Sequence, residues 1–472
     1  MFVRNLTLTL LAATALSACT LAPKTERPAL PVADAWPIAA ANTGTASAAD
    51  LGWREVFIDP RLQGVIDLAL ANNRDLRIAV LNIEQSRAQY RIQRSALVPA
   101  VEVNANATRG QSSSAQVVSI PGIATSRSVE VYTANLGIAS WEVDLFGRIR
   151  SLSNAALQNY LATQETSRSV QVSLIAQTAG AWLNLAADQD LLAVSQETLR
   201  TRQETTTLIR RRFEAGAISQ LELSQALTLV EAARSDVATA LALVEQDKNA
   251  LRLVVGADVP NDLLPAGGLV TAQILRDLPA GLPSEVLTRR PDVLAAEHQL
   301  AASNASIGAA RAAFFPSISL TASTGVASNS LGNLFDSGNG AWTFQPRISL
   351  PIFSGGANIA NLDAAKAGRD IAVANYERAV QTAFREVSDG LAVQSTIAER
   401  VGSQERLVAA SNDTVRLSQA RYGAGIDSSL AVLDAQRTLY ASQKTLIVAR
   451  LARETNLATL YKALGGGAPP AR

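Results

Sequence analysis

The chain has 472 residues, enough for two or three ordinary domains or for one very elongated domain. Its formal net charge of +1 gives no indication of nucleic acid or of any strongly charged partner. Hydrophobic residues make up 48% of the chain and aromatic residues only 5%, a composition rich in alanine and leucine that favours long packed helices. After the N-terminal region no stretch of 18 apolar residues occurs, which argues against a transmembrane helix.

The N-terminus has the layout of a secretory signal. Arg4 supplies a positive charge, and Leu6 to Leu16 form a mostly apolar run that is too short to span a bilayer. Leu16-Ser17-Ala18-Cys19 follows and resembles the bacterial lipobox, in which the cysteine is acylated and becomes the first residue of the mature protein. We therefore expect residues 1–18 to be a signal peptide.

Cys19 is the only cysteine, so no internal disulfide is possible. The lipobox resemblance implies that it carries N-palmitoyl and S-diacylglycerol groups. The alternative is a leftover cysteine beside an ordinary signal-peptidase site. Thr20 stands where an aspartate would resemble an inner-membrane retention signal, so the outer membrane is the expected destination.

Proline and glycine divide the rest of the chain into long helices. Segments without proline run from Arg148 to Arg212 and from Ala357 to Tyr422, and segments without proline or glycine run from Ala217 to Val255 and from Ile426 to Leu464. These lengths exceed the mean helix of about 11–12 residues several-fold. Such helices need neighbours packed as in a coiled coil.

The chain is a tandem duplication. Arg212-Phe213-Glu214-Ala215-Gly216 recurs as Arg421-Tyr422-Gly423-Ala424-Gly425, and each copy precedes a helix of similar length. Asn73-Arg74-Asp75-Leu76 likewise has a counterpart in Arg290-Pro291-Asp292-Val293. The expected order is an extended lipidated segment at 19–59, a first repeat at 60–260, a linker at 261–283, a second repeat at 284–465 and a tail at 466–472.

Each repeat contains one β-hairpin, because apolar and polar residues alternate with a period of two. The hairpin tips are rich in serine, glycine and asparagine, as mobile exposed loops tend to be. The expected strands are Val101–Thr108, Tyr132–Ile138, Ser317–Ser323 and Trp342–Leu350, with tips at 110–128 and 328–340.

Strands with one apolar and one polar face suit a membrane barrel with a wet lumen, although a half-buried soluble sheet gives the same alternation. Four strands cannot close a barrel, for which about eight is the practical minimum, and an open edge is not tolerated in lipid. If the strands cross a membrane, several chains must share one barrel. Three chains give twelve strands, and the long helices then continue the tube into the periplasm.

Several motifs occur in a fixed order: the lipobox at Cys19, Trp53 with Ala69–Asn73, Ser140–Arg148, Gly281–Asp292 and the two glycine-centred turns. Together they resemble the TolC-type outer-membrane factor family, in its branch of NodT-like efflux lipoproteins. The resemblance covers essentially the whole mature chain. It implies an α+β membrane protein, in which a trimeric TolC-like 12-stranded β-barrel, with four strands per protomer, is continued by a long α-helical barrel.

The resemblance also implies a function. The chain is expected to be the outer-membrane channel of a tripartite efflux pump of the resistance-nodulation-division class, passively conducting small molecules from periplasm to exterior. The implied partners are two further copies of the chain, a periplasmic membrane-fusion adaptor, an inner-membrane transporter and outer-membrane lipid. A type I secretion conduit and a lipid-tethered periplasmic coiled-coil scaffold are the alternatives; a pure scaffold would not need the β-hairpins.

The turns of the two helical hairpins are the candidate site, since in the family these tips form the periplasmic entrance and meet the adaptor. In a threefold assembly each side chain there forms a ring, and three carboxylates around a narrow pore attract cations. An acid stands at Asp427 where TolC has a basic residue, so the inter-helix links of TolC are not carried over. Surface carboxylates after a helix turn are also common. The matching residues are Gly216, Glu222, Tyr422, Gly425, Asp427 and Asp434.

Two tryptophans are candidates for the membrane interface, Trp141 and Trp342. Trp141 is placed where a strand leaves the membrane, which aromatic rings favour, and a packing role is the alternative. Phe146-Gly147-Arg148 indicates a strand-to-helix joint with backbone angles that suit glycine. Arg290-Pro291-Asp292 indicates a helix start.

Enzymatic function has little support. His298 is the only histidine, which excludes a multi-histidine metal site, and no glycine-rich phosphate-binding loop with a following lysine occurs. We expect no metal, no cofactor other than the lipid on Cys19, and no catalysis. A conduit of this kind takes its energy from its inner-membrane partner.

Overall fold

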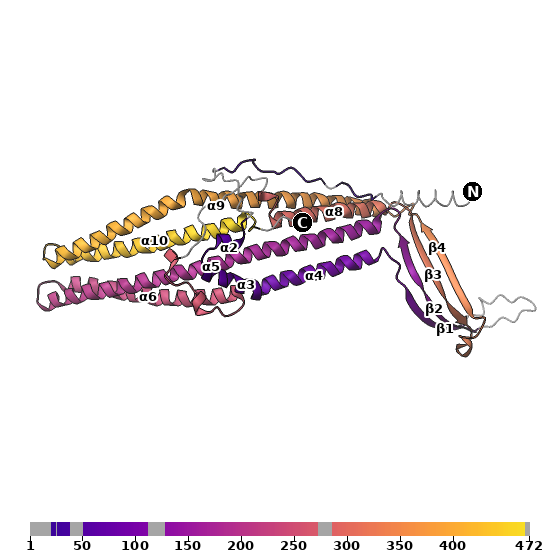
Figure 1. The fold of residues 1–472 in the computed structure, drawn as a ribbon, viewed down its shortest axis with the longest axis horizontal. Helices are drawn as coiled ribbons and strands as arrows, with labels where there is room; N and C mark the ends of the chain where they lie inside the picture. The colour runs from indigo at the N-terminus through magenta and orange to yellow at the C-terminus, as the bar shows by residue number, and fades with distance from the viewer. Residues whose placement is uncertain (1–19, 25, 38–50, 112–127, 272–285, 468–472) are drawn as a thin grey trace, which may run out of the picture. The chain divides into compact units, whose positions relative to one another are not determined.

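The computed structural model describes residues 20–24, 26–37, 51–111, 128–271 and 286–467 (Figure 1). The signal peptide, Cys19, the tip of the first β-hairpin, and most of the 261–283 linker and of the 466–472 tail lie outside the described residues. The chain divides into two compact units. We call them the strand unit (1–28, 83–162 and 296–375) and the hairpin unit (29–82, 163–295 and 376–472).

Four long helices occupy the segments that lack proline. Helix α5 spans Arg148–Glu214 and α6 spans Gln220–Val255, while α9 spans Ala357–Gly423 and α10 spans Ser429–Ala463. The predicted long helices are confirmed to within three residues at their ends. In the hairpin unit α5 pairs with α6 and α9 pairs with α10, each through a tight turn (Figure 1).

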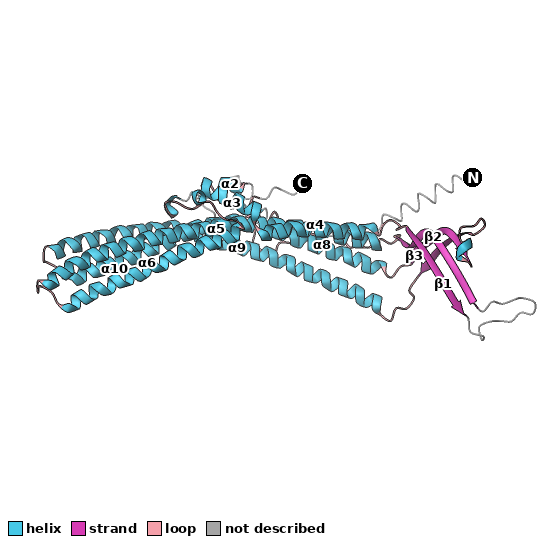
Figure 2. Cartoon of the chain, turned by 90° about the horizontal axis from the view of Figure 1, so that it is seen from below, coloured by secondary structure: helices cyan, strands magenta, loops and turns pink. Residues whose placement is uncertain are grey.

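Shorter helices complete the helical part (Figure 2), and two of them begin at a proline. Pro60 opens α3 and Pro291 opens α8, because the missing N–H of proline costs nothing in the first helical turn. In the described residues no helix has the length and apolar character needed to cross a membrane. The short helices are α2 (Trp53–Val56), α3 (Pro60–Asn72), α4 (Arg74–Ser95), α8 (Pro291–Ala312), η2 (Asn261–Leu263), η3 (Leu269–Thr271) and η4 (Leu331–Asn333).

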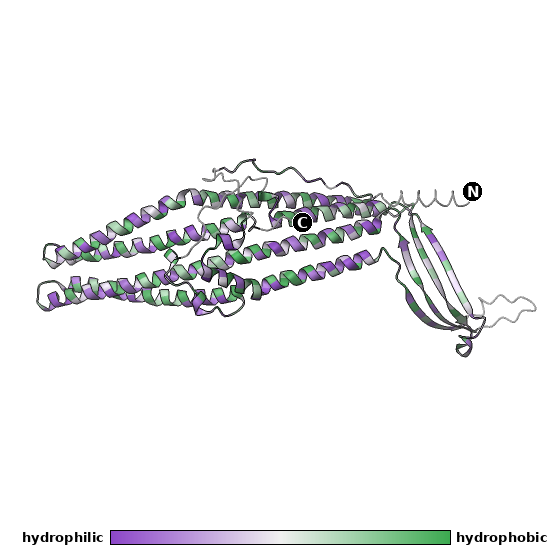
Figure 3. Ribbon diagram, viewed as in Figure 1, coloured by the Kyte–Doolittle hydropathy of each residue, from purple (hydrophilic) through white to green (hydrophobic). Residues whose placement is uncertain are grey.

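The strand unit contains one antiparallel sheet with the order β1-β2-β3-β4. The two predicted hairpins therefore lie side by side, joined by pairing of β2 with β3. Apolar and polar residues alternate along the strands (Figure 3), as the period of two requires. The strands are β1 (Glu102–Gln111), β2 (Ser128–Val143), β3 (Ser317–Ser328) and β4 (Gly340–Ser349).

The tip of the second β-hairpin is more ordered than the sequence predicts. It contains the short helix η4, and the N–H of Ala327 donates to the carbonyl of Asn339 at 2.9 Å. Leu334, directly after η4, is buried. An apolar residue among serines and glycines therefore folds the loop back on itself.

The core of the hairpin unit surrounds the middle of α5 and α9 and the C-terminal ends of α6 and α10. The buried Trp182 of α5 donates from Nε1 to the carbonyl of Leu263 at 3.0 Å. Phe57 meets Tyr461 of α10 edge to face, with ring centroids 5.4 Å apart. This cluster ties α2, α3 and the 261–271 segment to the long helices.

The duplication has a structural counterpart in one repeated contact. Asn73, which precedes α4, donates from Nδ2 to the carbonyl of Val254 at the end of α6, at 2.7 Å. Arg290, which precedes α8, donates from Nη1 to the carbonyl of Ala463 at the end of α10, at 2.6 Å. In both repeats, therefore, the side chain that precedes the shorter helix (α4 or α8) donates to one of the last carbonyls of a long helix (α6 or α10). These last carbonyls have no partner within their own helix.

The strand-to-helix joint before α5 has the predicted glycine geometry. Gly147 has a φ of +76°, a conformation that side chains with a Cβ rarely adopt. The carboxylate of Asp144 then accepts from the N–H groups of Ile149 and Arg150, at 3.2 and 2.8 Å, and so caps the helix. The prediction of a joint at Phe146-Gly147-Arg148 is confirmed.

Candidate functional site: the two helical-hairpin tips

The first tip is the turn between α5 and α6. Gly216 has a φ of +73°, its N–H donates to the carbonyl of Phe213 at 2.8 Å, and the N–H of Ala217 donates to the carbonyl of Arg212 at 2.9 Å. This pair of bonds is the Schellman arrangement, which satisfies the last carbonyls of a helix around a left-handed glycine. The turn therefore depends on Gly216.

The second tip, between α9 and α10, has the same arrangement. Gly425 has a φ of +76°, its N–H donates to the carbonyl of Tyr422 at 3.0 Å, and the N–H of Ile426 donates to the carbonyl of Arg421 at 2.9 Å. A Cβ at either glycine would have nothing within 4 Å, so the requirement for glycine is one of backbone angle and not of space. The repeated sequence encodes the same turn twice.

Between the two turns lies a small apolar cluster, which we call the tip cluster. Its buried members come from both hairpins, so the two tips pack on each other. Tyr422 is only 3% exposed within one chain, and its hydroxyl has no hydrogen-bond partner in the described part of the chain. The buried residues of the tip cluster are Ile209, Leu223, Ala226, Tyr422, Val432 and Leu433.

Arg212 of the first hairpin holds Tyr422 of the second. Its guanidinium carbon lies 4.2 Å from the centroid of the tyrosine ring, and Nη2 donates to the carbonyls of Tyr422 and Gly423 at 3.0 and 3.3 Å. One cation therefore binds both the ring face and the open end of α9. Arg212 was not among the residues predicted for the site. The feature of the sequence that indicates it is the arginine at the same position in both copies of the turn, Arg212 and Arg421.

Glu222 also joins the two hairpins. The hydroxyl of Ser429, in the first turn of α10, donates to Oε2 of Glu222 at 2.6 Å. Glu222 lies in the first turn of α6, where a negative charge is favoured, and its N–H donates to Oγ of Ser219 at 3.4 Å. The side chain is thus directed toward the second hairpin.

The two aspartates each have an arginine partner within the second hairpin. Asp427 accepts from Nε and Nη2 of Arg421 at 2.6 and 2.9 Å, and Asp434 pairs with Arg437 one helical turn further on. The hydrogen bond and charge of Arg421 hold the pKa of Asp427 below its usual value. These two carboxylates, which were predicted to form rings in a threefold assembly, are therefore charge-compensated within each chain.

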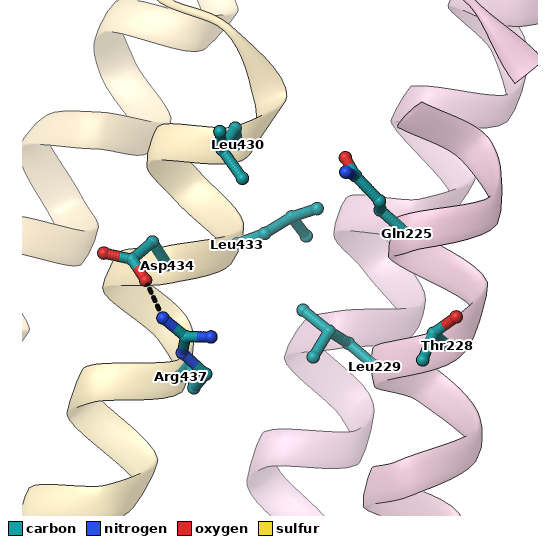
Figure 4. Close-up of a pocket in the computed structure, with 7 residues that line it drawn as sticks. All are labelled: Gln225, Thr228, Leu229, Leu430, Leu433, Asp434 and Arg437. Carbon is teal, nitrogen blue, oxygen red and sulfur yellow. Dashed lines mark hydrogen bonds and ion pairs between the residues drawn. The ribbon is translucent and has the colours of Figure 1, made fainter. Parts of the chain in front are cut away.

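An open pocket of about 280 Å³ lies between α6 and α10 beside these residues (Figure 4). Leu229 of α6 and Leu433 of α10 extend into the space between the helices, while the Asp434–Arg437 pair lies on the α10 side. The other lining residues are Gln225, Thr228 and Leu430.

Further polar contacts join the hairpins deeper than the tips. The hydroxyls of Ser195 and Tyr440 lie 3.0 Å apart, and Gln436 donates to Thr205 at 2.8 Å. The buried Arg202 lies 5.5 Å from the Tyr440 ring centroid, and burial lowers its pKa. Sequence reasoning missed these residues because polar side chains on a long helix are normally solvated.

The two candidate interface tryptophans differ in environment. Trp141 is half-buried near the end of β2, and its Nε1 is enclosed without a hydrogen-bond partner in the described residues. Trp342 of β4 is exposed. Close to the end of β2, Phe146 stacks on Phe315, with ring centroids 4.8 Å apart. A role for either tryptophan at a membrane interface stays a prediction.

The described residues contain no cluster of three or more histidine, cysteine, aspartate or glutamate side chains arranged to hold a metal ion. His298 of α8 contacts the side-chain oxygen of Gln158 on α5 through Nδ1 at 2.8 Å. His298 therefore joins α8 to α5 through a side-chain hydrogen bond.

Comparison with known proteins identifies the family. The model of the family described as outer membrane efflux protein matches residues 65–257 and 282–466. The probable efflux pump outer membrane protein TtgC and the antibiotic efflux pump outer membrane protein ArpC, both of Pseudomonas putida, are each 48% identical over 456 residues, which cover 96% of this chain and 93% of each relative.

A solved structure has the same fold. The open state of the MtrE outer membrane channel of Neisseria gonorrhoeae superposes with a TM-score of 0.86 and 42% identity, covering 95% of this chain and 98% of that one. The family match spans both repeats, and these similarities extend over nearly the whole length of each protein. The chain belongs to the outer membrane efflux protein family, the TolC-type family that its motifs resemble.

Proposed function

We propose that this chain is one protomer of a homotrimeric conduit that passively carries small molecules from the periplasm to the exterior. A periplasmic membrane-fusion adaptor and an inner-membrane transporter complete the pump and supply its energy. Membership of the outer membrane efflux protein family supports the location and the efflux role. The unpaired edges of the sheet support a single barrel to which several chains contribute strands.

The two outer strands of the described sheet, β1 and β4, each have an unpaired edge. Both β1 and β4 have ten residues, every one of them exposed, and within the described part of the chain neither has a second neighbour in the sheet. Unpaired backbone donors and acceptors at such an edge are not tolerated in lipid. Pairing β4 of one chain with β1 of the next satisfies both edges, and three copies give twelve strands in a closed ring.

The hairpin tips then form the periplasmic entrance and meet the adaptor. Arg212 and Glu222 bind the second hairpin to the first, so that the entrance is narrow while these contacts hold. Opening requires the second hairpin to move away from the first. The residues proposed for this entrance are Gly216, Glu222, Tyr422, Gly425, Asp427 and Asp434.

The lipid on Cys19 is a separate proposal that rests on the lipobox sequence. Palmitate labelling of cells expressing the intact chain should label the mature protein, and Cys19→Ser should abolish that labelling. Retention of label in the Cys19→Ser protein would contradict acylation at this residue. Outer-membrane assembly of the unlipidated protein can be followed in the same cells.

Small molecules are the proposed cargo because ArpC, a relative of 48% identity, is named for antibiotic efflux. The test is deletion of the gene, followed by measurement of the intracellular accumulation of an amphipathic dye and of the secreted polypeptides. A small-molecule conduit predicts dye accumulation with unchanged secretion, restored by the intact gene. Loss of secreted polypeptides alone would favour type I secretion, and no change in either would favour the scaffold.

A further inference from the structure

We infer that an apolar seam locks neighbouring protomers together where the strands meet the helices: Ile352 and Phe353 of one chain pack against Val98 and Val101 of the next. This inference rests on the proposed homotrimer and adds the side chains that hold it. A second copy of this chain therefore covers each exposed linker.

The linker after β4 leaves two large apolar side chains bare. Ile352 is 87% exposed and Phe353 is 89% exposed, in the short segment between the end of β4 and the start of α9. Removal of such a side chain from water is favourable. Two adjacent bare side chains of this size indicate a surface that is covered in the assembled protein.

The linker before β1 is exposed in the same way. Val98 is 63% exposed and Val101 is 61% exposed, between the end of α4 and the start of β1. Ile92, in the last turns of α4, is exposed as well. Both outer linkers of the sheet therefore carry uncovered apolar residues.

The two inner linkers provide the comparison within the same chain. Phe146, between β2 and α5, stacks on Phe315, between α8 and β3, with centroids 4.8 Å apart. The inner linkers thus partly cover each other across the pairing of β2 with β3, and Phe315 is 41% exposed where Phe353 is 89% exposed. The outer linkers lack this arrangement because β1 and β4 lie at opposite edges of the sheet.

The outer linkers cannot cover each other within one chain. Three strand spacings separate β1 from β4, a distance of about 14 Å at roughly 4.8 Å per spacing. The strands alternate in direction, so β4 runs antiparallel to the β1 of a following copy. Antiparallel pairing places the residues after β4 beside the residues before β1, and this brings Ile352 and Phe353 to Val98 and Val101 of the next chain.

The same contact recurs around a closed ring because it is heterologous: one chain donates the β4 linker and the next receives it with the β1 linker. In a trimer it occurs three times. The seam lies on the helix side of the last paired residues, Ser317 and Ser349. It therefore adds side-chain packing where the shared sheet ends.

The test is chemical cross-linking of purified, detergent-solubilised full chain carrying Val98→Cys and Phe353→Cys together. A short bismaleimide should produce covalent dimers and trimers. Each single variant should give none, and neither should the pair Val98→Cys with Phe335→Cys. Phe335 is a matched control because it is 80% exposed but lies between β3 and β4, at the far end of the sheet.

Light scattering on the same sample distinguishes failure of the apolar seam from failure of the proposed homotrimer. A trimeric mass without cross-linked bands would overturn the seam and leave the proposed function intact, whereas a monomeric mass would overturn both. A fluorophore on Phe353→Cys in proteoliposomes gives an independent check. Strong quenching by nitroxide-labelled lipid would show that lipid covers this linker and would also overturn the seam, while weak quenching supports it.

Discussion

Arg212 and Tyr422 link the two helical hairpins across their tips, with the guanidinium carbon 4.2 Å from the centroid of the tyrosine ring and a hydrogen bond of 3.0 Å to the tyrosine carbonyl. Tyr422 is itself buried in the tip cluster. A single arginine thus connects the end of α5 to the end of α9. Together with the hydrogen bond from Ser429 to Glu222, this link restrains separation of the tips.

Replacement of Arg212 should loosen the entrance. Arg212→Ala removes the cation–π contact and both hydrogen bonds, a loss of roughly 1–3 kcal/mol for a charged donor. Single-channel conductance in planar bilayers should rise. Arg211→Ala is the matched control, because this neighbouring arginine is exposed and carries the same charge. Equal conductance in Arg212→Ala and the unmodified protein would remove this contact from the entrance.

The aspartates of the second hairpin should affect both conductance and ion selectivity. If Asp427 and Asp434 narrow the entrance, their replacement by alanine should raise single-channel conductance. Arg421→Ala tests the charge separately, since it leaves the Asp427 carboxylate uncompensated in each protomer of the proposed trimer. The reversal potential in a salt gradient should then shift toward cation selectivity. Arg416→Ala, which breaks the exposed pair with Asp413 instead, should leave the reversal potential unchanged.

The sequence predicts the long helices, the strands and the two glycine turns because each depends on local periodicity or on one special residue. It does not predict the partners of the tip carboxylates. Asp427 and Asp434 look like bare charges in sequence. The Gly425 turn brings Asp427 to Arg421, six residues away, and the helical period brings Asp434 to Arg437, three residues away. The role of Arg212 is still less visible, because its partner is 210 residues away.

Arg290 should be among the least replaceable charged residues. It is buried and binds Asp292, Glu386 and the carbonyl of Ala463, at 2.6 to 3.0 Å. The side chains of Asp292 and Glu386 are 39% and 31% exposed, so water partly solvates their charges when the arginine is removed, and the loss is smaller than the about 3–5 kcal/mol of a fully buried ion pair. Arg290→Ala should lower the thermal unfolding midpoint, as measured by circular dichroism, because it also removes the donor to the carbonyl of Ala463.

Arg406→Ala is the comparison for Arg290→Ala. It breaks an exposed ion pair with Glu399, and such pairs are worth roughly 0–1 kcal/mol. A similar loss of stability in the two variants would show that the Arg290 contacts do not clamp the end of α10.

Asp247 should make stability depend on pH. Burial and the neighbouring carboxylate of Asp188 raise its pKa to about 6, above the ordinary value of 3.8. The folded state therefore holds the proton more tightly than the unfolded state between these values, so this contribution to stability is present below about pH 4 and is lost as the pH rises through about 6.

Asp247→Asn removes that dependence. The unfolding midpoint should rise relative to the unmodified protein at about pH 7 and change little at about pH 4, where the carboxyl is already protonated. Asp262→Asn, at an exposed position, is the control. An equal change at both pH values would show that the carboxyl does not titrate in this range.

The mass and symmetry of the detergent-solubilised mature protein test the shared conduit most directly, by light scattering and negative-stain imaging. A shared trimeric conduit should give an elongated particle with threefold symmetry and about three times the mass of one protomer. A monomer or dimer that stays soluble without detergent would contradict it, because the edges of β1 and β4 would then need no partner chain.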